Sequence, residues 1–71
     1  MGLNHLAELY NAQARYAEAG SLYERALAIL EKRSDVEASE MKNLLEDYAA
    51  VLRQLRRLEE AETIARRAEH I

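Results

Sequence analysis

Apolar residues recur along the chain every three or four positions, which is the spacing of one face of an α-helix. Four stretches with this spacing predict four helices. The predicted helices run from about residue 3 to 14, 17 to 32, 35 to 56 and 58 to 70. In the third stretch the apolar positions follow a heptad-like seam, which packs either on the rest of the chain or between two chains. The seam residues are Met41, Leu45, Tyr48, Leu52 and Leu55.

The second stretch is apolar over a wider arc than one neighbouring helix needs, which predicts a helix that packs on two sides. Gly20 lies inside this stretch, where glycine costs about 1 kcal/mol relative to alanine. Two interpretations are open at Gly20: a closely approaching neighbouring helix, or a local weakness of this helix.

The sequence Ser34-Asp35-Val36-Glu37 predicts a break before the third helix. Ser34 or Asp35 would cap the helix, and Glu37 would reach back to complete a capping box. No proline enforces this break. A continuous rod is therefore an alternative for residues 33–40, and such a rod would favour a domain-swapped chain.

The stretch Arg15–Ile29 returns in altered form at Arg57–Ile71, which gives the repeat a period of 42. The identical pairs are Arg15/Arg57, Glu18/Glu60, Ala19/Ala61, Arg25/Arg67, Ala26/Ala68 and Ile29/Ile71. One helical unit is therefore used twice. We expect a first repeat over residues 1–33, and an inter-repeat segment with a second repeat over residues 34–71.

Paired helices with small residues at their crossing resemble the tetratricopeptide repeat. The first unit matches the family pattern at Leu6, Ala7, Tyr10, Ala19, Tyr23 and Ala26, and the second at Tyr48, Ala49, Leu52, Ala61, Ala65 and Ala68. The period of 42 is similar to the longer kinesin-light-chain type of this repeat. The resemblance implies an all-α fold of two antiparallel hairpins, four helices stacked as a short right-handed solenoid.

The chain departs from the resembled family at its turns. Ala14 and Arg56 stand where that family favours glycine between its paired helices. A left-handed residue other than glycine costs roughly 1 kcal/mol or more. Val36 and Ser39 stand in an inter-repeat loop that usually carries prolines, which predicts a more helical connection here.

The resemblance also implies a function, namely a protein-interaction scaffold that binds a peptide or protein in the concave groove lined by the first helix of each repeat. The implied lining residues are Asn4, Glu8 and Asn11 in the first repeat, and Glu46, Ala50, Arg53 and Gln54 in the second. Asparagine suits this role because its amide both donates and accepts hydrogen bonds. The alternative interpretation of these residues is an ordinary solvated helix face.

A second functional hypothesis is structural, because repeat hairpins need neighbours and usually at least three repeats are required for stability. With two repeats, we expect a fragment of a longer array, an engineered chain, or a homo-oligomer formed through uncapped apolar ends. The residues expected to face water at these ends are Leu3, Leu6, Ile64, Ala65, Ala68 and Ile71.

Composition narrows the possible partners. The chain has 71 residues, no cysteine, no proline and a formal net charge of −3 with mixed signs, so we expect no nucleic-acid partner. We expect no membrane partner either, because no apolar run approaches the roughly 20 residues that span a bilayer. No signal-peptide pattern opens the chain, and we expect a cytoplasmic protein.

The sequence offers little catalytic or metal-binding chemistry. His5 and Glu8 lie one helical turn apart, but two ligands are too few for a structural zinc site, so no metal or cofactor is expected. No serine or threonine has a histidine and an acid in a nucleophile pattern, and we expect no enzyme activity. A basic cluster at Arg53, Arg56, Arg57, Arg66 and Arg67 could take an acidic partner or phosphate, or could pair with Glu59, Glu60 and Glu62.

Overall fold

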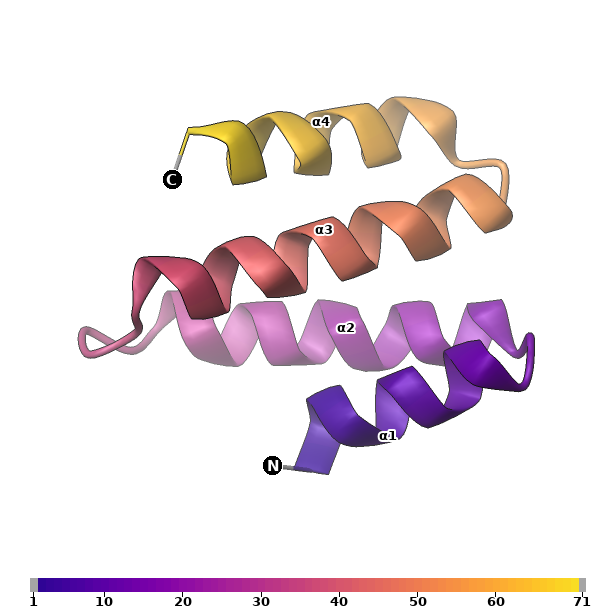
Figure 1. Ribbon diagram of the computed structural model, residues 1–71, viewed down its shortest axis with the longest axis horizontal. Coiled ribbons are helices and arrows are strands. Elements are labelled where there is room, and N and C mark those ends of the chain that lie inside the picture. Colours follow the sequence, from indigo (N-terminus) through magenta and orange to yellow (C-terminus); the bar gives the residue numbers. More distant parts are fainter. Residues whose placement is uncertain (1, 71) are drawn as a thin grey trace.

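The computed structural model describes the backbone of residues 2–70 and the side chains of residues 5–70. It contains four α-helices joined by short connections (Figure 1). They are α1 (Gly2–Ala12), α2 (Tyr16–Glu31), α3 (Ala38–Gln54) and α4 (Leu58–Glu69). Every element of the described chain is helical, which confirms the predicted all-α class.

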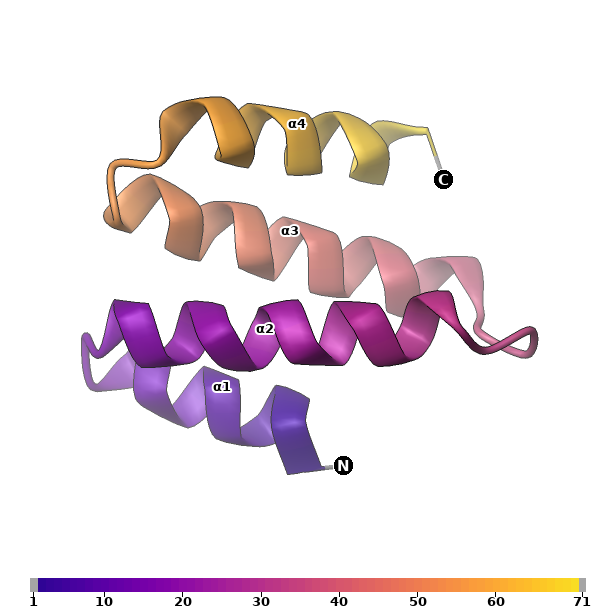
Figure 2. The same cartoon turned by 180° about the vertical axis from the view of Figure 1, so that it is seen from behind.

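Helices that follow one another in sequence are neighbours in space: α1 packs on α2, α2 on α3, and α3 on α4. The chain reverses direction at each connection, so the beginning of α1 and the end of α4 lie at the same end of the molecule (Figure 1). In Figure 1, α1 and α3 lie nearer the viewer than α2, and Figure 2 shows α2 in front. The helices α1 and α3 therefore share one layer, and α2 lies in a second layer behind them.

Buried alanines lie at equivalent positions of the two hairpins and let the paired helices approach closely. They are Ala7, Ala19 and Ala26 in the first hairpin, and Ala49, Ala61 and Ala68 in the second. Larger apolar side chains fill the space around them, including the seam residues Leu45, Tyr48 and Leu52 of α3. In this structure the centre of the seam is buried within one chain, and Met41 and Leu55 at its two ends are half-buried. Removal of these apolar surfaces from water is the main term that stabilises the fold.

Helix α2 is covered on two sides, as its wide apolar arc predicts. On the α3 side, a β-carbon added to Gly20 would lie 3.5 Å from the side chains of both Val51 and Leu55. That distance is an ordinary van der Waals contact. Gly20 therefore lies at the crossing of α2 and α3, but the crossing leaves room for a methyl group.

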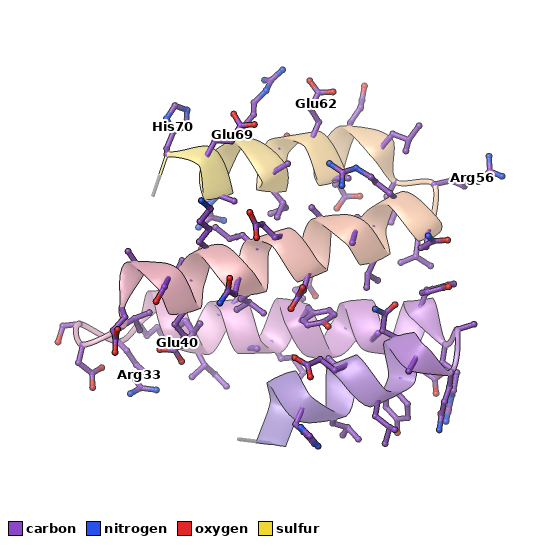
Figure 3. All side chains as sticks on the ribbon, in the orientation of Figure 1. Arg33, Glu40, Arg56, Glu62, Glu69 and His70 are labelled. Atoms are coloured by element: carbon purple, nitrogen blue, oxygen red, sulfur yellow. The ribbon has the colours of Figure 1, made fainter. Side chains whose placement is uncertain are left out.

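Both hairpin turns close in the same way, and neither uses glycine. Ala14 and Arg56 adopt positive φ angles of 60° and 64°. The closing bonds run from the backbone N–H of Arg15 to the carbonyl of Tyr10 and from that of Arg57 to the carbonyl of Leu52, each 2.9 Å long. These bonds form a Schellman motif, in which the left-handed residue is usually glycine. Figure 3 shows the Arg56 side chain extending into solvent at the second turn.

The arginine that follows each turn also stabilises the start of the next helix. Neither Arg15 nor Arg57 caps the backbone with its side chain; each guanidinium instead holds a glutamate of the first helical turn. The Arg15 Nε donates to Glu18 at 2.8 Å, and two Arg57 nitrogens donate to Glu60 at 2.6 Å. These hydrogen bonds lower the pKa of both carboxyls and keep negative charge near the positive end of the helix dipole.

The connection between the hairpins differs from the prediction. The predicted capping box is wrong: α3 begins at Ala38, Glu37 occupies the N-cap position, and its side chain makes no capping hydrogen bond. Asp35 instead accepts hydrogen bonds from the Arg33 guanidinium at 3.1 and 3.2 Å. Val36 packs against the core, and the backbone of Glu37 is extended. The segment between α2 and α3 is therefore a loop rather than a continuous helix.

Glycine at either turn should stabilise the protein. We expect Ala14→Gly and Arg56→Gly each to raise the free energy of unfolding by about 1 kcal/mol, because glycine adopts a positive φ without strain at a β-carbon. Urea denaturation measures the change as a shift of the unfolding midpoint, with the slope of the unfolding free energy against urea concentration unchanged. The matched control is Ala50→Gly at an exposed position inside α3, which should lower stability by about 1 kcal/mol. Equal losses at Ala14 and Ala50 would contradict the Schellman assignment.

The room beside Gly20 leads to a second stability prediction. Gly20→Ala should raise the free energy of unfolding by about 1 kcal/mol, because alanine has the higher helix propensity and its methyl group meets Val51 and Leu55 at contact distance. Gly20→Leu is the control, since the extra carbons would overfill the α2–α3 crossing and destabilise it. A loss of stability in Gly20→Ala would mean that the crossing is tighter than this structure has it.

Candidate functional site

The candidate site is the solvent side of the layer formed by α1 and α3, which we call the α1/α3 face (Figure 1). Residues spaced three, four or seven positions apart project from one side of a helix. Of the predicted lining residues, Glu8, Glu46, Ala50, Arg53 and Gln54 are exposed and Asn11 is half-buried. The side chain of Asn4 lies outside the described residues. The structure thus brings predicted residues of both helices to one solvent-facing layer.

The polar residues of this face are not engaged with other side chains. Elsewhere, five ion pairs form, at Arg15–Glu18, Arg33–Asp35, Arg57–Glu60, Arg66–Glu62 and Arg67–Glu31. Within residues 5–70, no hydrogen bond or ion pair joins the side chains of Glu8, Asn11, Glu46, Arg53 or Gln54 to another side chain. Their donors and acceptors are available to a ligand.

The α1/α3 face divides into two parts. Glu46 and Arg53 lean toward α4, where they border a hollow of about 300 Å³. The other residues that line this hollow are Lys42, Ala49, Ala65, Ala68 and Glu69. Because Lys42 lies there too, positive and negative charges are mixed on this side. The second part lies on the side of α1, and its charge is negative.

Asp47 and Glu8 form the acidic part. Burial raises the pKa of the Asp47 carboxyl, and the nearby charges of Glu8 and Glu46 raise it further. Glu8 belongs to α1 and Asp47 to α3, so carboxylates of two different helices approach each other here. Like charges in a partly desolvated setting oppose one another's ionisation. A cationic group from a ligand would relieve this repulsion.

Tyr23 of α2 lies beneath the acidic part. It is 1% exposed, and burial raises its pKa to about 12, with further contributions from the charges of Asp47 and Glu8. Tyr23 is part of the hydrophobic core and is therefore a packing residue. Neither Asp47 nor Tyr23 was among the predicted lining residues. The repeat could have pointed to Asp47, because Asp47 is the second-repeat equivalent of His5. His5 follows the predicted lining residue Asn4 in the sequence.

The residues predicted to face water at the two ends of the molecule differ in their solvent exposure. Ala68 is 3% exposed, so the expectation that it faces water is wrong; it packs between α3 and α4. Ile64 and Ala65 are half-buried, whereas Leu6 is exposed. The side chains of Leu3 and Ile71 lie outside the described residues.

The remaining candidate sites bring together few groups. Three of the five clustered arginines are paired with Glu60, Glu62 and Glu31, which leaves little of the basic cluster for an acidic ligand. Across the described residues, no three histidine, aspartate or glutamate side chains are grouped as a metal site would require. None of the described helices has the length and apolarity needed to cross a bilayer.

Comparison with known families agrees with this geometry. The family model of the tetratricopeptide repeat matches residues 1–71. Comparison with curated protein sequences and with solved structures gives no significant match. The match covers both hairpins, and the kinesin-light-chain type of the repeat stays a prediction.

The raised pKa of Tyr23 predicts an alkaline loss of stability. The folded state favours the neutral phenol, so this contribution is fully present below the unfolded pKa of 10.0 and is lost as pH rises to about 12. Unfolding experiments across this range should show the decline. Tyr23→Phe keeps the packing and should make the decline shallower, with Tyr48 contributing to the remainder because burial also raises its pKa. An unchanged decline in Tyr23→Phe would contradict the assignment.

Proposed function

The chain belongs to the tetratricopeptide repeat family, and from this premise we propose that it binds a peptide segment of another protein along the α1/α3 face. Proteins of this family generally mediate protein–protein interactions, and their repeats are typically non-catalytic scaffolds. The proposed mechanism is rigid presentation: packed helices hold the recognising side chains in place, so little conformational freedom is lost on binding.

The observation that carries the proposal is that polar side chains from α1 and α3 lie on this face with no side-chain partner among the described residues. Ion pairs at Arg15–Glu18, Arg57–Glu60 and Arg66–Glu62 engage part of the charge at the turns and on α4. Among the described residues, no such pair engages the polar side chains of the α1/α3 face. Asn11 and Gln54 can each donate to and accept from an extended peptide backbone. Such contacts would fix the register of a bound segment without dictating its sequence.

The acidic part of the face favours a basic segment. Glu8 and Asp47 approach each other from two helices, and the pKa of Asp47 is raised first by burial and then by the charge of Glu8. A lysine or arginine side chain placed between them would form charge-assisted hydrogen bonds with both carboxylates. We therefore propose that the partner segment is extended and carries at least one positive charge that lies over Glu8 and Asp47.

Binding of a basic peptide tests the proposal directly. A short peptide of alternating lysine and serine should bind the protein, as measured by fluorescence anisotropy, and the glutamate–serine peptide should not. Glu8→Gln and Asp47→Asn should each weaken binding by roughly 2- to 5-fold, the scale of one exposed ion pair. Added salt should weaken binding to the unmodified protein more than to the variants.

Two controls separate a site from general charge attraction. Glu59→Gln makes the same charge change at an exposed position of α4, outside the hollow that Glu46 and Arg53 border, and should leave binding unaltered. Asp47→Asn should also raise stability at neutral pH: its folded pKa is raised, so ionised Asp47 opposes folding above that pKa. Equal weakening by Glu59→Gln would show non-specific attraction and would refute the proposed site.

A further inference from the structure

The repeat allows the two ends of the molecule to be compared position by position. A shift by one period carries α1 onto α3 and α2 onto α4. Helix α2 presents Gly20, Tyr23 and Leu27 to α3; Gly20 lies beside Val51 and Leu55, and the other two follow on the same helix side. The internal contact between α2 and α3 therefore defines what a stacking surface looks like in this chain.

The outer side of α4 does not have that character. The positions equivalent to Gly20, Tyr23 and Leu27 hold Glu62, Ala65 and Glu69. Figure 3 shows Glu62 and Glu69 projecting from α4 away from the rest of the molecule. Glu62 accepts a hydrogen bond from Arg66 at 2.5 Å, and the side chains of Glu62 and Arg66 are exposed. Burying these charges under another helix would require desolvation of both carboxylates. The polar outer side of α4 therefore acts as a cap of the kind that terminal repeats carry.

The outer side of α1 has the opposite character. Val51 and Tyr48 of α3 are buried, and their equivalents one period earlier are Leu9 and Leu6. Leu9 is 51% exposed and Leu6 is 38% exposed. The equivalent of Leu55 is Gln13, which is also exposed and uncharged. This side of α1 therefore keeps the apolar character of a stacking surface, and no helix of the described chain covers it.

We propose that the outer side of α1 binds the same side of α1 in a second copy of this chain. A two-fold contact places the same surface of each copy against the other. Any charge on that surface would therefore face an identical charge and repel it. Leu6, Leu9 and Gln13 carry none, and two copies can pack their leucines together without like-charge repulsion. A head-to-tail contact would instead press α1 against the carboxylates of α4. The chemistry of the two ends thus selects a closed dimer over an open chain of copies.

The dimer is weak, because its apolar centre consists of few side chains and small interfaces lie at the low-affinity end of protein association. It should appear as a concentration-dependent mass in sedimentation or light scattering. The mass should rise from one chain to two, up to about 1 mM protein, and should stop at two. The α1/α3 face is a different side of α1, so peptide binding and dimer formation are independent.

Two matched variants test the interface. Leu9→Glu should raise the dimer dissociation constant by roughly tenfold or more, because each copy would bury an unpaired carboxylate. Leu58→Glu makes the same change at the α4 end, where Leu58 is 61% exposed, and should leave the dissociation constant unchanged. Both positions are on the surface, so circular dichroism should show intact helices in both variants. An equimolar mixture of Leu9→Glu and Leu9→Lys should associate more strongly than either variant alone.

Three results would overturn the proposal. A mass of one chain at every concentration would mean that the apolar side of α1 does not bind its copy. Growth of the mass beyond two chains would indicate head-to-tail stacking. Loss of association in Leu58→Glu, or its persistence in Leu9→Glu, would place the contact at another surface.

Discussion

The packing of α2 between α1 and α3 is the contact on which the rest of the structure depends. Neither hairpin covers its own apolar surface, and the α2–α3 contact is the only extensive one between them in the described chain. It buries Tyr23 from one side and Val51 from the other. The same contact sets α1 beside α3 in one layer. The α1/α3 face and its acidic part at Glu8 and Asp47 therefore exist only as long as the two hairpins stay stacked.

The fold could be predicted from the sequence to a large extent because the signals were local and repeated. Helical spacing located four helices, and the repeated alanines located the two crossings. The inter-repeat loop was less predictable because its local capping signal competed with a local ion pair and a tertiary contact. Ser34 and Asp35 favour a cap, but Asp35 pairs with Arg33 and Val36 packs against the core. The contact of Val36 with the core is a tertiary contact, and α3 begins after it, at Ala38.

The candidate site was predictable only as a set of positions. Register and resemblance placed Glu8, Asn11 and Gln54 near solvent on the first helix of each hairpin. They could not supply the repulsion between Glu8 and Asp47, because it depends on how closely α1 approaches α3. The difference between the two ends was missed for another reason. Counting apolar residues grouped Ala65 and Ala68 with Leu6, whereas comparison across the repeat shows that Ala68 is interior and that glutamates flank Ala65.

Several of these features weaken a domain that has little stability to lose. Three features each oppose folding by a modest amount. They are the positive φ angles of Ala14 and Arg56, the glycine at position 20 inside α2, and the ionised carboxylate of Asp47, whose pKa is raised in the folded state. Asp47 differs from the others, because its repulsion with Glu8 is relieved when a cation binds between them. Ligand binding to the folded state adds stability that grows with ligand concentration. A basic partner on the α1/α3 face and a second copy on the outer side of α1 would thus both stabilise a two-hairpin stack that has a single internal interface between its repeats.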